Sequence, residues 1–368
     1  MLSEEILVKN NKELISRQRY AVQLTREKKY VKALKVINEN IQSARGDPHN
    51  YYMKGIVLSE LLEHELSAVA FEKCIKRDKD NRLAKFYLGL NYLSLENFEE
   101  GCRYYDFRHD IDFSKKFRGI KSWSPKCKTG RVFIWAEQGI GDEVMFLQLL
   151  PFLENFEHNF ILECDHRLHG VILENYPWLG VVARGSEVER SEFDYQFPIG
   201  DLLKFFHKNI NEIPRSVLSV SASKKVDHAV AMYNMSGLSL TGVSWLSMNE
   251  DYGLRRSRSV EVICKHLDPA ETAIVNLQYL APESDIDRIR NMGFKVVDEF
   301  DCHQDIQSLF ALISKCDKVI SIDNSVAHFA GALGKNIETW IPAAPNWRWG
   351  SGKNYSYWYP SMKLKKFD

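Results

Sequence analysis

A group of polar residues near the end of the chain has the composition and spacing of an anion-binding site. The group consists of Asp323, Asn324, Ser325 and His328. It follows an apolar run at 318–322 and begins a segment of helical pattern that ends at Gly334, before a second apolar run at 337–341. The pattern predicts a strand tip followed by a helix N-terminus, where free N–H groups and the helix dipole attract negative charge. Such a site can hold a diphosphate.

Two other interpretations of the same group are available. Asp323, Asn324 and Ser325 are all common helix caps, and His328 can be a satisfied core histidine. A hydrolase triad of Ser325, His328 and Asp323 is rejected, because triad members come from separate elements and no G-x-S-x-G turn is present.

A glycine turn near the middle of the chain is the second candidate for chemistry. Gly139 and Gly141 follow an apolar run at 131–136 and precede a helical pattern. A dinucleotide fingerprint would need glycine at position 144, where Val144 stands, so a nicotinamide oxidoreductase is disfavoured. The turn places Asp142 at the start of the helix, where it is either a general base for an acceptor hydroxyl or a helix cap.

Basic and polar residues follow two further strand-like runs. Arg255, Arg256 and Arg258 come after the run at 240–246, and their guanidinium groups match phosphate oxygens, although charged loops are usually only solvated surface. Gln278 and Tyr279 end the next run, where they either contact a nucleotide base or ribose or form a plain strand exit.

The order of apolar segments from Arg131 onward alternates between strand and helix patterns in two series, the second beginning at Leu240. This order predicts two α/β domains with mainly parallel sheets and a ligand cleft at the carboxyl ends of their strands. All of the candidate residues above fall at such ends.

The first third of the chain contains a different pattern. Small residues recur at intervals of 34 residues at Ala21, Gly55 and Gly89, which is the period of the tetratricopeptide repeat. Three further positions share the register: Leu24, Leu58 and Tyr92; Ala33, Ser67 and Gly101; and Ile37, Phe71 and Tyr105. Stacked helix pairs are therefore expected, with a generic helical bundle as the alternative.

Composition sets the broad class of the protein. The 368 residues include 49 basic and 49 acidic side chains, so no global field favours nucleic acid, and no apolar run approaches the roughly 18 residues of a membrane span. The seven cysteines contain no C-x-x-C pair, which favours reduced thiols and a cytoplasmic location. Cys164, His166 and His169 lack a fourth ligand at zinc spacing, so a surface turn is preferred to a metal site.

Four segments in this order resemble a known family: WAEQGIGDEVMFLQLLP, GVSWLS with its arginine loop, NLQYLAP, and SIDNSVAHFAGALGKNIETWIPAAPNWRWG. The chain resembles bacterial tetratricopeptide-repeat proteins with a C-terminal GT-B glycosyltransferase module similar to the lipopolysaccharide heptosyltransferases, and more distantly O-linked N-acetylglucosamine transferases. The likeness covers the chain from about Trp123 to the end, and the repeats in outline.

The resemblance implies an α/β fold with N-terminal helical repeats and transfer of a sugar from a nucleotide donor, without a metal ion or other cofactor. Asp142 matches a base or acceptor contact, the arginine loop matches a phosphate contact, and the group at 323–328 matches the donor site. Relatives often have a basic residue where Tyr279 stands, which shifts phosphate neutralisation to the arginine loop.

The expected organisation has five parts. They are tetratricopeptide repeats (1–118), a linker (119–130), an acceptor-binding Rossmann-like domain (131–235), a nucleotide-sugar-binding Rossmann-like domain (236–345), and a C-terminal segment (346–368) that crosses back to the acceptor-binding domain. The acceptor would be a protein or a glycan, possibly held by the repeats. A non-catalytic repeat scaffold with degenerate transferase lobes is the main alternative, and a nucleotide-sugar epimerase is a third hypothesis.

Overall fold

The computed structural model describes residues 2–43, 46–110, 119–249 and 253–367, and the chain divides into two compact units. Unit 1 comprises residues 1–116 and 344–351, and unit 2 comprises residues 117–343 and 352–368. The expected domain boundary at residue 118 lies outside the described residues.

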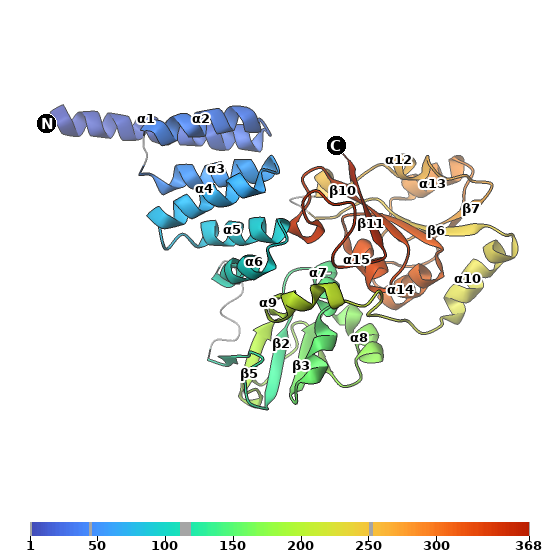
Figure 1. The fold of residues 1–368 in the computed structure, drawn as a ribbon. Helices are drawn as coiled ribbons and strands as arrows, with labels where there is room; N and C mark the ends of the chain where they lie inside the picture. Colours follow the sequence, from blue (N-terminus) through green and yellow to red (C-terminus); the bar gives the residue numbers. More distant parts are fainter. Residues whose placement is uncertain (1, 44–45, 111–118, 250–252, 368) are drawn as a thin grey trace. The chain divides into compact units, whose positions relative to one another are not determined.

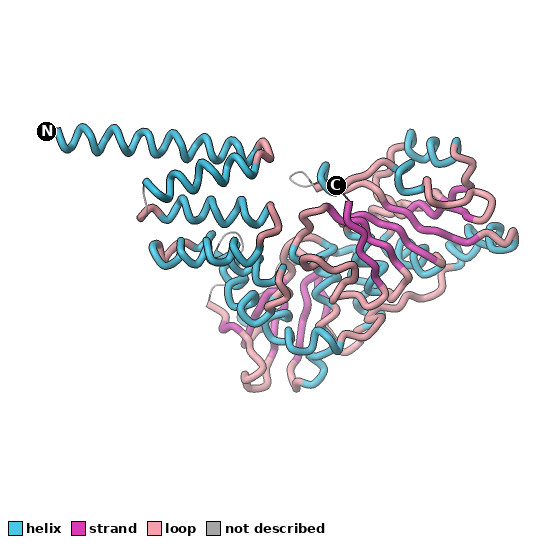
Figure 2. The backbone as a smooth tube through the Cα atoms, turned by 45° about the horizontal axis from the view of Figure 1, so that its top comes forward, coloured by secondary structure: helices cyan, strands magenta, loops and turns pink. Residues whose placement is uncertain are grey.

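Unit 1 consists of helices stacked as successive hairpins (Figures 1 and 2). The helices are α1 (Leu2–Arg26), α2 (Tyr30–Ser43), α3 (Pro48–Glu60), α4 (His64–Arg77), α5 (Arg82–Ser94) and α6 (Phe98–Tyr105), followed by the 3₁₀ turn η1 (Asp106–Asp110).

The 34-residue period of the sequence recurs in the packing of these hairpins. A Cβ atom built on Gly55 would lie 2.7 Å from the ring of Phe71, and one on Gly89 would lie 2.7 Å from the backbone nitrogen of Tyr105. Small residues of the first helix of a pair thus face large residues of the second, which lets the two helices approach closely. The turn residues Lys28, Leu62 and Glu96 repeat at the same interval with φ of 57°, 62° and 59°. Each pair therefore repeats one local geometry.

A segment distant in sequence completes unit 1. The chain leaves unit 2 after residue 343, forms the 3₁₀ turn η6 (Trp347–Trp349), and returns after residue 351. Trp347 packs edge-on against Tyr105 with ring centroids 5.4 Å apart, and the amide of Ser351 donates to the carbonyl of Ser94 at 3.0 Å. Both tryptophans of the turn are buried, so the segment belongs to the core of unit 1.

Unit 2 contains two parallel sheets, each with its own helices (Figure 1). The first lobe has strand order β1-β5-β2-β3-β4. Its elements are β1 (Lys121–Ser122), β2 (Arg131–Trp135), α7 (Ile140–Leu147), η2 (Leu150–Asn155), β3 (Asn159–Cys164), η3 (His166–Leu168), α8 (His169–Asn175), β4 (Gly180–Ala183), η4 (Arg190–Glu192), β5 (Tyr195–Pro198), α9 (Asp201–Phe206) and η5 (His207–Glu212).

The second lobe has strand order β11-β10-β9-β6-β7-β8. Its elements are α10 (Lys224–Met235), β6 (Ser239–Ser244), α11 (Gly253–Arg256), α12 (Val260–Cys264), β7 (Thr272–Asn276), α13 (Glu283–Asn291), β8 (Lys295–Val297), α14 (Ile306–Lys315), β9 (Lys318–Ile322), α15 (Ser325–Ala332), β10 (Ile337–Pro342) and β11 (Met362–Phe367). The strand pairs of the described residues are parallel in both sheets, as their alternation with helices predicts.

Three expected boundaries differ from the structure. The linker at 119–130 contains β1 and Trp123, whose buried indole packs on Phe197 of the first lobe. Helix α10, expected in the first domain, packs against β6 and α14 of the second. The segment from residue 346 contributes η6 to unit 1 and then pairs as β11 with β10, because its alternating residues 362–365 fit a sheet edge.

Candidate functional site at the switch points of the two sheets

The glycine turn lies where the strand order of the first sheet reverses. The chain runs from β2 to β3 and β4 on one side, whereas β5 joins β2 on the other side. Ligands of open parallel sheets bind outside the carboxyl ends of the strands at such a reversal. Gly139 follows β2 at this point and is the N-cap of α7. Asp142 is half-buried, and its Oδ2 accepts from the Gly139 amide at 3.4 Å, so it caps the helix while keeping part of its carboxylate accessible.

Three buried carboxylates, Glu163, Glu137 and Glu143, fix this turn. Glu163 accepts hydrogen bonds from the amides of Ala136 at 3.1 Å and Gly185 at 3.3 Å. Glu137 accepts from the amide of Gly200 at 2.9 Å, which ties the end of β2 to the end of β5. Buried carboxylates that accept backbone N–H bonds hold loops in place, because an unmet buried donor is costly.

The third carboxylate, Glu143, follows Asp142 on α7. Its Oε2 accepts from the amide of Asp165 at 2.8 Å, and its Oε1 lies 3.5 Å from Arg184, which also donates to the carbonyl of Gln138 at 2.8 Å. Arg184 therefore bridges the helix and the left-handed residue of the turn, Gln138, whose φ is 62°. Burial raises the pKa of Glu143 to about 7, although the Asp165 amide and Arg184 act in the opposite direction.

This carboxyl gives the fold a predictable pH dependence. A Glu whose folded pKa exceeds the unfolded value of roughly 4.3 contributes its full stability below about pH 4 and loses it as the pH rises through about 7. Glu143→Gln does not titrate. The free energy of unfolding of the variant, relative to wild type, is expected to increase by up to about 3 kcal/mol between roughly pH 4.5 and 8. Urea unfolding of both proteins at several pH values measures this increase, and Glu157→Gln, at an exposed position, is the control. A difference in the free energy of unfolding between Glu143→Gln and wild type that does not change with pH would contradict the prediction.

The sheet of the second lobe reverses between β6 and β9. Asn324 joins the two strands there, because its Nδ2 donates to Ser244 Oγ at 2.8 Å and to the Leu246 carbonyl at 3.2 Å. Its Oδ1 accepts from the Val326 amide at 3.0 Å, which makes it the N-cap of α15. The capping interpretation of Asn324 is therefore confirmed, and the cap fixes the helix N-terminus at the switch point.

The arginine loop reaches the same edge, but its members have different surroundings. Arg256 Nε lies 3.1 Å from Asp323 Oδ2 across the switch point, and this carboxylate is buried. Arg258 instead places its guanidinium 3.4 Å from the ring centroid of Phe367 on β11. Arg255 is half-buried on α11. Residues 250–252 of the loop lie outside the described residues. Arg256 is thus the arginine that the structure brings to the predicted anion group.

Gln278 follows β7 and reaches the point where the chain leaves β6. Its side chain is buried, and Oε1 accepts three hydrogen bonds, from Ser244 Oγ at 3.0 Å and from the amides of Trp245 and Leu246 at 2.9 and 2.8 Å. Nε2 donates to the carbonyl of Tyr279 at 2.8 Å. Gln278 therefore satisfies the backbone where the chain leaves β6, and its contact with a base or ribose stays a prediction. Tyr279 is half-buried and its hydroxyl accepts from the Met248 amide at 3.4 Å.

The helices α7 and α15, which follow the central strands of the two lobes, contact each other. A Cβ atom on Gly141 would lie 3.0 Å from His328 Cδ2 and 3.3 Å from Ser325 Cα, so a larger residue would require α15 to give way by a few tenths of an ångström. His328 is buried, and its Nδ1 lies 2.9 Å from the Tyr359 hydroxyl. The structure therefore brings Gly141, the residue before Asp142, against Ser325 and His328, which lie more than 180 residues away in sequence.

Metal ligation and membrane insertion were also tested. Within the described ranges, no group of three or more His, Cys, Asp or Glu side chains is arranged to hold a metal ion. Cys164, the last residue of β3, is buried, and burial raises the pKa of its thiol to about 12. Among the helices of the described residues, none combines the length and apolar character that crossing a membrane requires.

Comparisons with known proteins gave one sequence relative and several structural ones. No family model matches the chain. FlbA of Caulobacter vibrioides is 26% identical over 360 residues, covering 89% of this chain but 59% of FlbA, so the chain spans about three-fifths of that relative.

The structural matches include the two transferase classes that the sequence resembles. Heptosyltransferase II of E. coli matches with a TM-score of 0.44 and 11% identity, over 64% of this chain and 90% of the enzyme. A family 9 glycosyl transferase from Veillonella parvula matches with a TM-score of 0.46 and 12% identity, over 66% and 89%. A mutant O-GlcNAc transferase from Thermobaculum terrenum matches 96% of this chain and 57% of its own, with a TM-score of 0.31 and 10% identity. The chain itself combines N-terminal helices with a pair of parallel α/β lobes.

Proposed function

We propose that the chain is a cytoplasmic glycosyltransferase of GT-B type, which moves a sugar from a nucleotide-sugar donor to a hydroxyl of a protein or glycan acceptor. The observation that carries the proposal is the contact between the N-termini of α7 and α15, each at the switch point of its sheet. A donor bound at the second switch point and an acceptor bound at the first would meet at this contact. The helical hairpins of unit 1 would be tetratricopeptide repeats that present the acceptor.

The residues have distinct roles in this reaction. Asp142 would accept the proton of the acceptor hydroxyl as its oxygen bonds to the anomeric carbon, and the bond from that carbon to the nucleoside diphosphate would break. Arg256 and the N–H groups at the start of α15 would stabilise the negative charge on the departing diphosphate. Gly139 would leave room for the substrates at the turn, and Gly141 would let the N-termini of α7 and α15 approach each other. No metal or other cofactor is required by this assignment.

Diphosphate binding tests the donor half of the proposal. Calorimetric titration of the full chain with UDP, ADP and GDP, and with the matching nucleosides, is expected to show one diphosphate bound more tightly than its nucleoside. Arg256→Ala should weaken binding of that diphosphate by about ten- to a hundredfold, because a charge-assisted hydrogen bond contributes about 1.5–3 kcal/mol. The affinity for the nucleoside should be unchanged.

Two variants keep this test interpretable. Arg256→Ala leaves the buried Asp323 without its ion pair, so the double variant Arg256→Ala, Asp323→Asn removes that cost. Arg290→Ala, an exposed arginine of α13 paired with Asp298, is the control and should bind as wild type does. The donor assignment is wrong if the folded wild-type chain binds none of these diphosphates at millimolar concentration.

A further inference from the structure

The first lobe of unit 2 is attached to both ends of α15 in the second lobe. At the N-terminus of this helix, Ser325 lies against Gly141 of α7. At its C-terminus, the Ala332 carbonyl accepts from the amide of Val217, in the connection between the lobes, at 3.1 Å. The carbonyl of Val217 in turn accepts from the hydroxyl of Tyr176, at the end of α8, at 3.1 Å. Contacts at the two ends of one helix do not oppose rotation of the first lobe about the axis of that helix.

A third contact between the lobes lies away from α15, where η3 meets α14. Arg167 of η3 donates from Nη1 to the carbonyl of His303, in the loop before α14, at 3.0 Å. Beside it, a Cβ atom on Gly170 would lie 3.5 Å from Gln307 Oε1, which is an ordinary contact distance. Rotation about α15 would separate η3 from α14, so it would have to break the hydrogen bond of Arg167.

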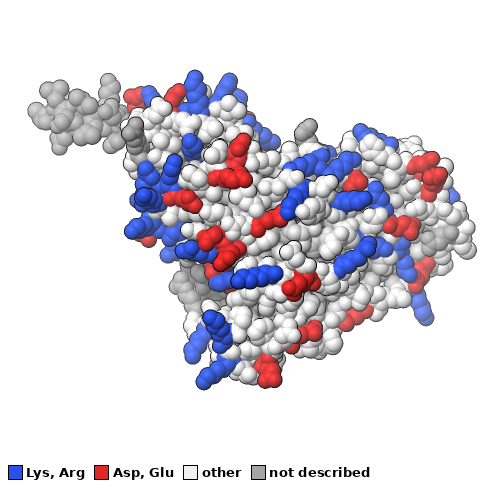
Figure 3. All heavy atoms as spheres, in the orientation of Figure 1, with Lys and Arg blue, Asp and Glu red and all other residues white. Residues whose placement is uncertain are grey.

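The guanidinium of Arg167 is held in place by Asp165. Nε donates to Oδ1 at 2.9 Å and Nη2 donates to Oδ2 at 2.8 Å, a bidentate arrangement that fixes the plane of the guanidinium. Basic and acidic side chains are interspersed on the face shown in Figure 3, and exposed ion pairs contribute little. Arg167 and Asp165 differ from such pairs, because their side chains are only 17% and 20% exposed. The third donor nitrogen, Nη1, therefore reaches the second lobe from a rigid mount.

The same pair is connected to the helix that carries Asp142. The amide of Asp165 donates to Glu143 Oε2 at 2.8 Å, and Glu143 follows Asp142 on α7. Glu143 is buried, so its carboxylate does not reorient freely in solvent. Hydrogen bonds through Glu143, Asp165 and Arg167 thus join α7 to the loop before α14 in the second lobe.

We infer that Arg167 is a positioning residue, which latches the two lobes at the separation at which Asp142 reaches a donor held at the second switch point. Its role in sugar transfer rests on the proposed function, whereas the latch is a property of the fold alone. Arg167 contacts neither substrate in this assignment and acts through the placement of α7. Precise placement matters because a displacement of about 1 Å at a reacting group costs about a hundredfold in rate.

The separation of the lobes tests the latch without any substrate. Nitroxide labels attached to p-acetylphenylalanine at Leu173 of α8 and Glu283 of α13, both exposed, avoid the seven native cysteines. Double electron–electron resonance is expected to show one narrow distance distribution in the otherwise unchanged full chain. Arg167→Met should broaden it toward longer distances. Arg167→Lys should give an intermediate distribution, because an ammonium group can donate to the carbonyl but cannot form the bidentate pair with Asp165.

Steady-state kinetics tests the positioning role, with the donor and acceptor that wild type uses. Arg167→Met should lower kcat by about ten- to a hundredfold. Its affinity for the nucleoside diphosphate, measured by calorimetry, should change less than about twofold, because Arg256 and the N-terminus of α15 both belong to the second lobe. Arg167→Lys should recover part of kcat. A merely structural role would instead lower the unfolding midpoint and leave kcat per folded molecule unchanged.

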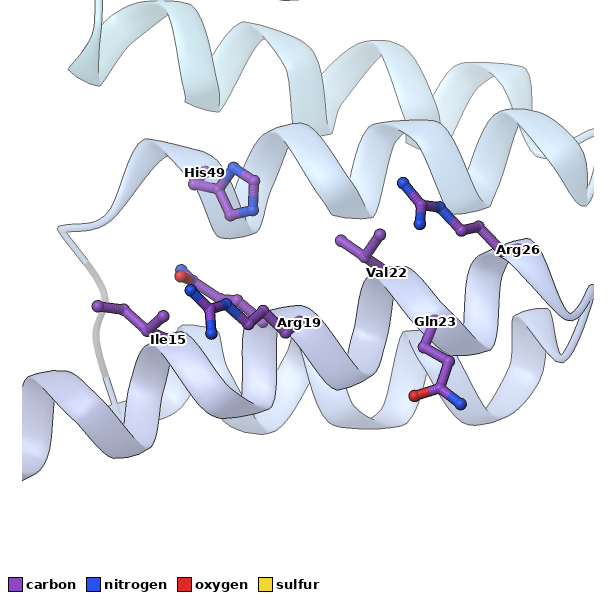
Figure 4. Close-up of a pocket in the computed structure, with 7 residues that line it drawn as sticks. Ile15, Arg19, Val22, Gln23, Arg26 and His49 are labelled. Carbon is purple, nitrogen blue, oxygen red and sulfur yellow. The ribbon is translucent and has the colours of Figure 1, made fainter.

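Three further variants serve as controls. Asp165→Asn combined with Arg167→Met leaves no unpaired carboxylate and should behave as Arg167→Met does. Arg288→Met removes an arginine that pairs with Asp285 and Glu261 inside the second lobe, and it should match wild type in both measurements. Arg19→Met removes an equal charge from the lining of the pocket in unit 1 (Figure 4), and it should leave the distance distribution unchanged. Circular dichroism verifies that each variant is folded.

The two measurements separate failure of the latch from failure of the proposed function. An unchanged distance distribution or an unchanged kcat in folded Arg167→Met would overturn the inference, and so would equal broadening in Arg288→Met. If wild type neither binds a diphosphate nor transfers a sugar, the proposed function fails. The resonance measurement then decides the latch alone: a broadened distribution in Arg167→Met supports it, and an unchanged one overturns it.

Discussion

Replacing Asp142 with Asn is expected to lower the rate of sugar transfer by about two to four orders of magnitude while leaving nucleotide affinity unchanged. Asparagine keeps an oxygen that can accept from the Gly139 amide, so the start of α7 is preserved. It cannot take a proton from an attacking hydroxyl at neutral pH. The variant therefore separates the two functions of this carboxylate, helix capping and general base catalysis.

The measurement is nucleotide release from the donor in the presence of an acceptor, together with calorimetric nucleotide binding. The matched control is Asp305→Asn, because Asp305 also caps a helix, α14, through the Ser308 amide but lies at no switch point. Transfer at the wild-type rate by Asp142→Asn would remove Asp142 from the mechanism. If wild type itself shows no turnover with a donor that it binds, the non-catalytic scaffold becomes the better hypothesis. An epimerase would instead convert the donor without any acceptor.

Gln278→Ala should destabilise unit 2 strongly. The side chain satisfies a hydroxyl and two backbone amides where the chain leaves β6, and each buried donor without an acceptor costs about 1–3 kcal/mol. A total of roughly 3–5 kcal/mol is expected, which corresponds to a fall of about 10 °C or more in the unfolding midpoint of a unit of this size.

Differential scanning fluorimetry and urea unfolding measure this loss. Tyr279→Phe removes a single long hydrogen bond from the next residue, and it should change stability by less than about 1 kcal/mol. Gln278→Glu retains an acceptor for the three donors, but its second carboxylate oxygen would face the carbonyl oxygen of Tyr279. Its loss of stability should therefore lie between those of Gln278→Ala and Tyr279→Phe. A stable Gln278→Ala protein that has lost only nucleotide affinity would restore the ligand-contact interpretation.

The sequence predicted the layout of unit 2 well because the patterns that specify it, short apolar runs and the polar turns between them, are local. Strand β9 was expected with the bounds that the structure has, since short apolar runs between polar turns specify buried strands. Residues that follow parallel strands meet at one edge of a sheet, and this rule placed the arginine loop at the edge where Arg256 meets Asp323. The repeat period was visible because each hairpin repeats the same small-to-large contact.

Other features depend on where a side chain points, which no local pattern reveals. A glutamine after a strand has the same signature whether it faces a ligand or the backbone of the neighbouring strand, so the sequence left both interpretations of Gln278 open. Glu163 lies within a strand pattern and gave no sign that its carboxylate would hold the glycine turn. Tyr359 meets His328 only because β11 returns to the second sheet, and that pairing joins segments separated by an excursion through unit 1.

That excursion has a consequence for synthesis on the ribosome. The helices α1 to α6 are complete once Tyr105 has emerged, but the turn at Trp347 that packs on Tyr105 is translated about 240 residues later. At roughly 5–20 residues per second, the nascent helical unit waits about 12–50 s with this aromatic surface uncovered. Chains interrupted before Trp347 never cover it, and they are expected to expose the surface to chaperones and proteases even though every helix of the repeat has been made.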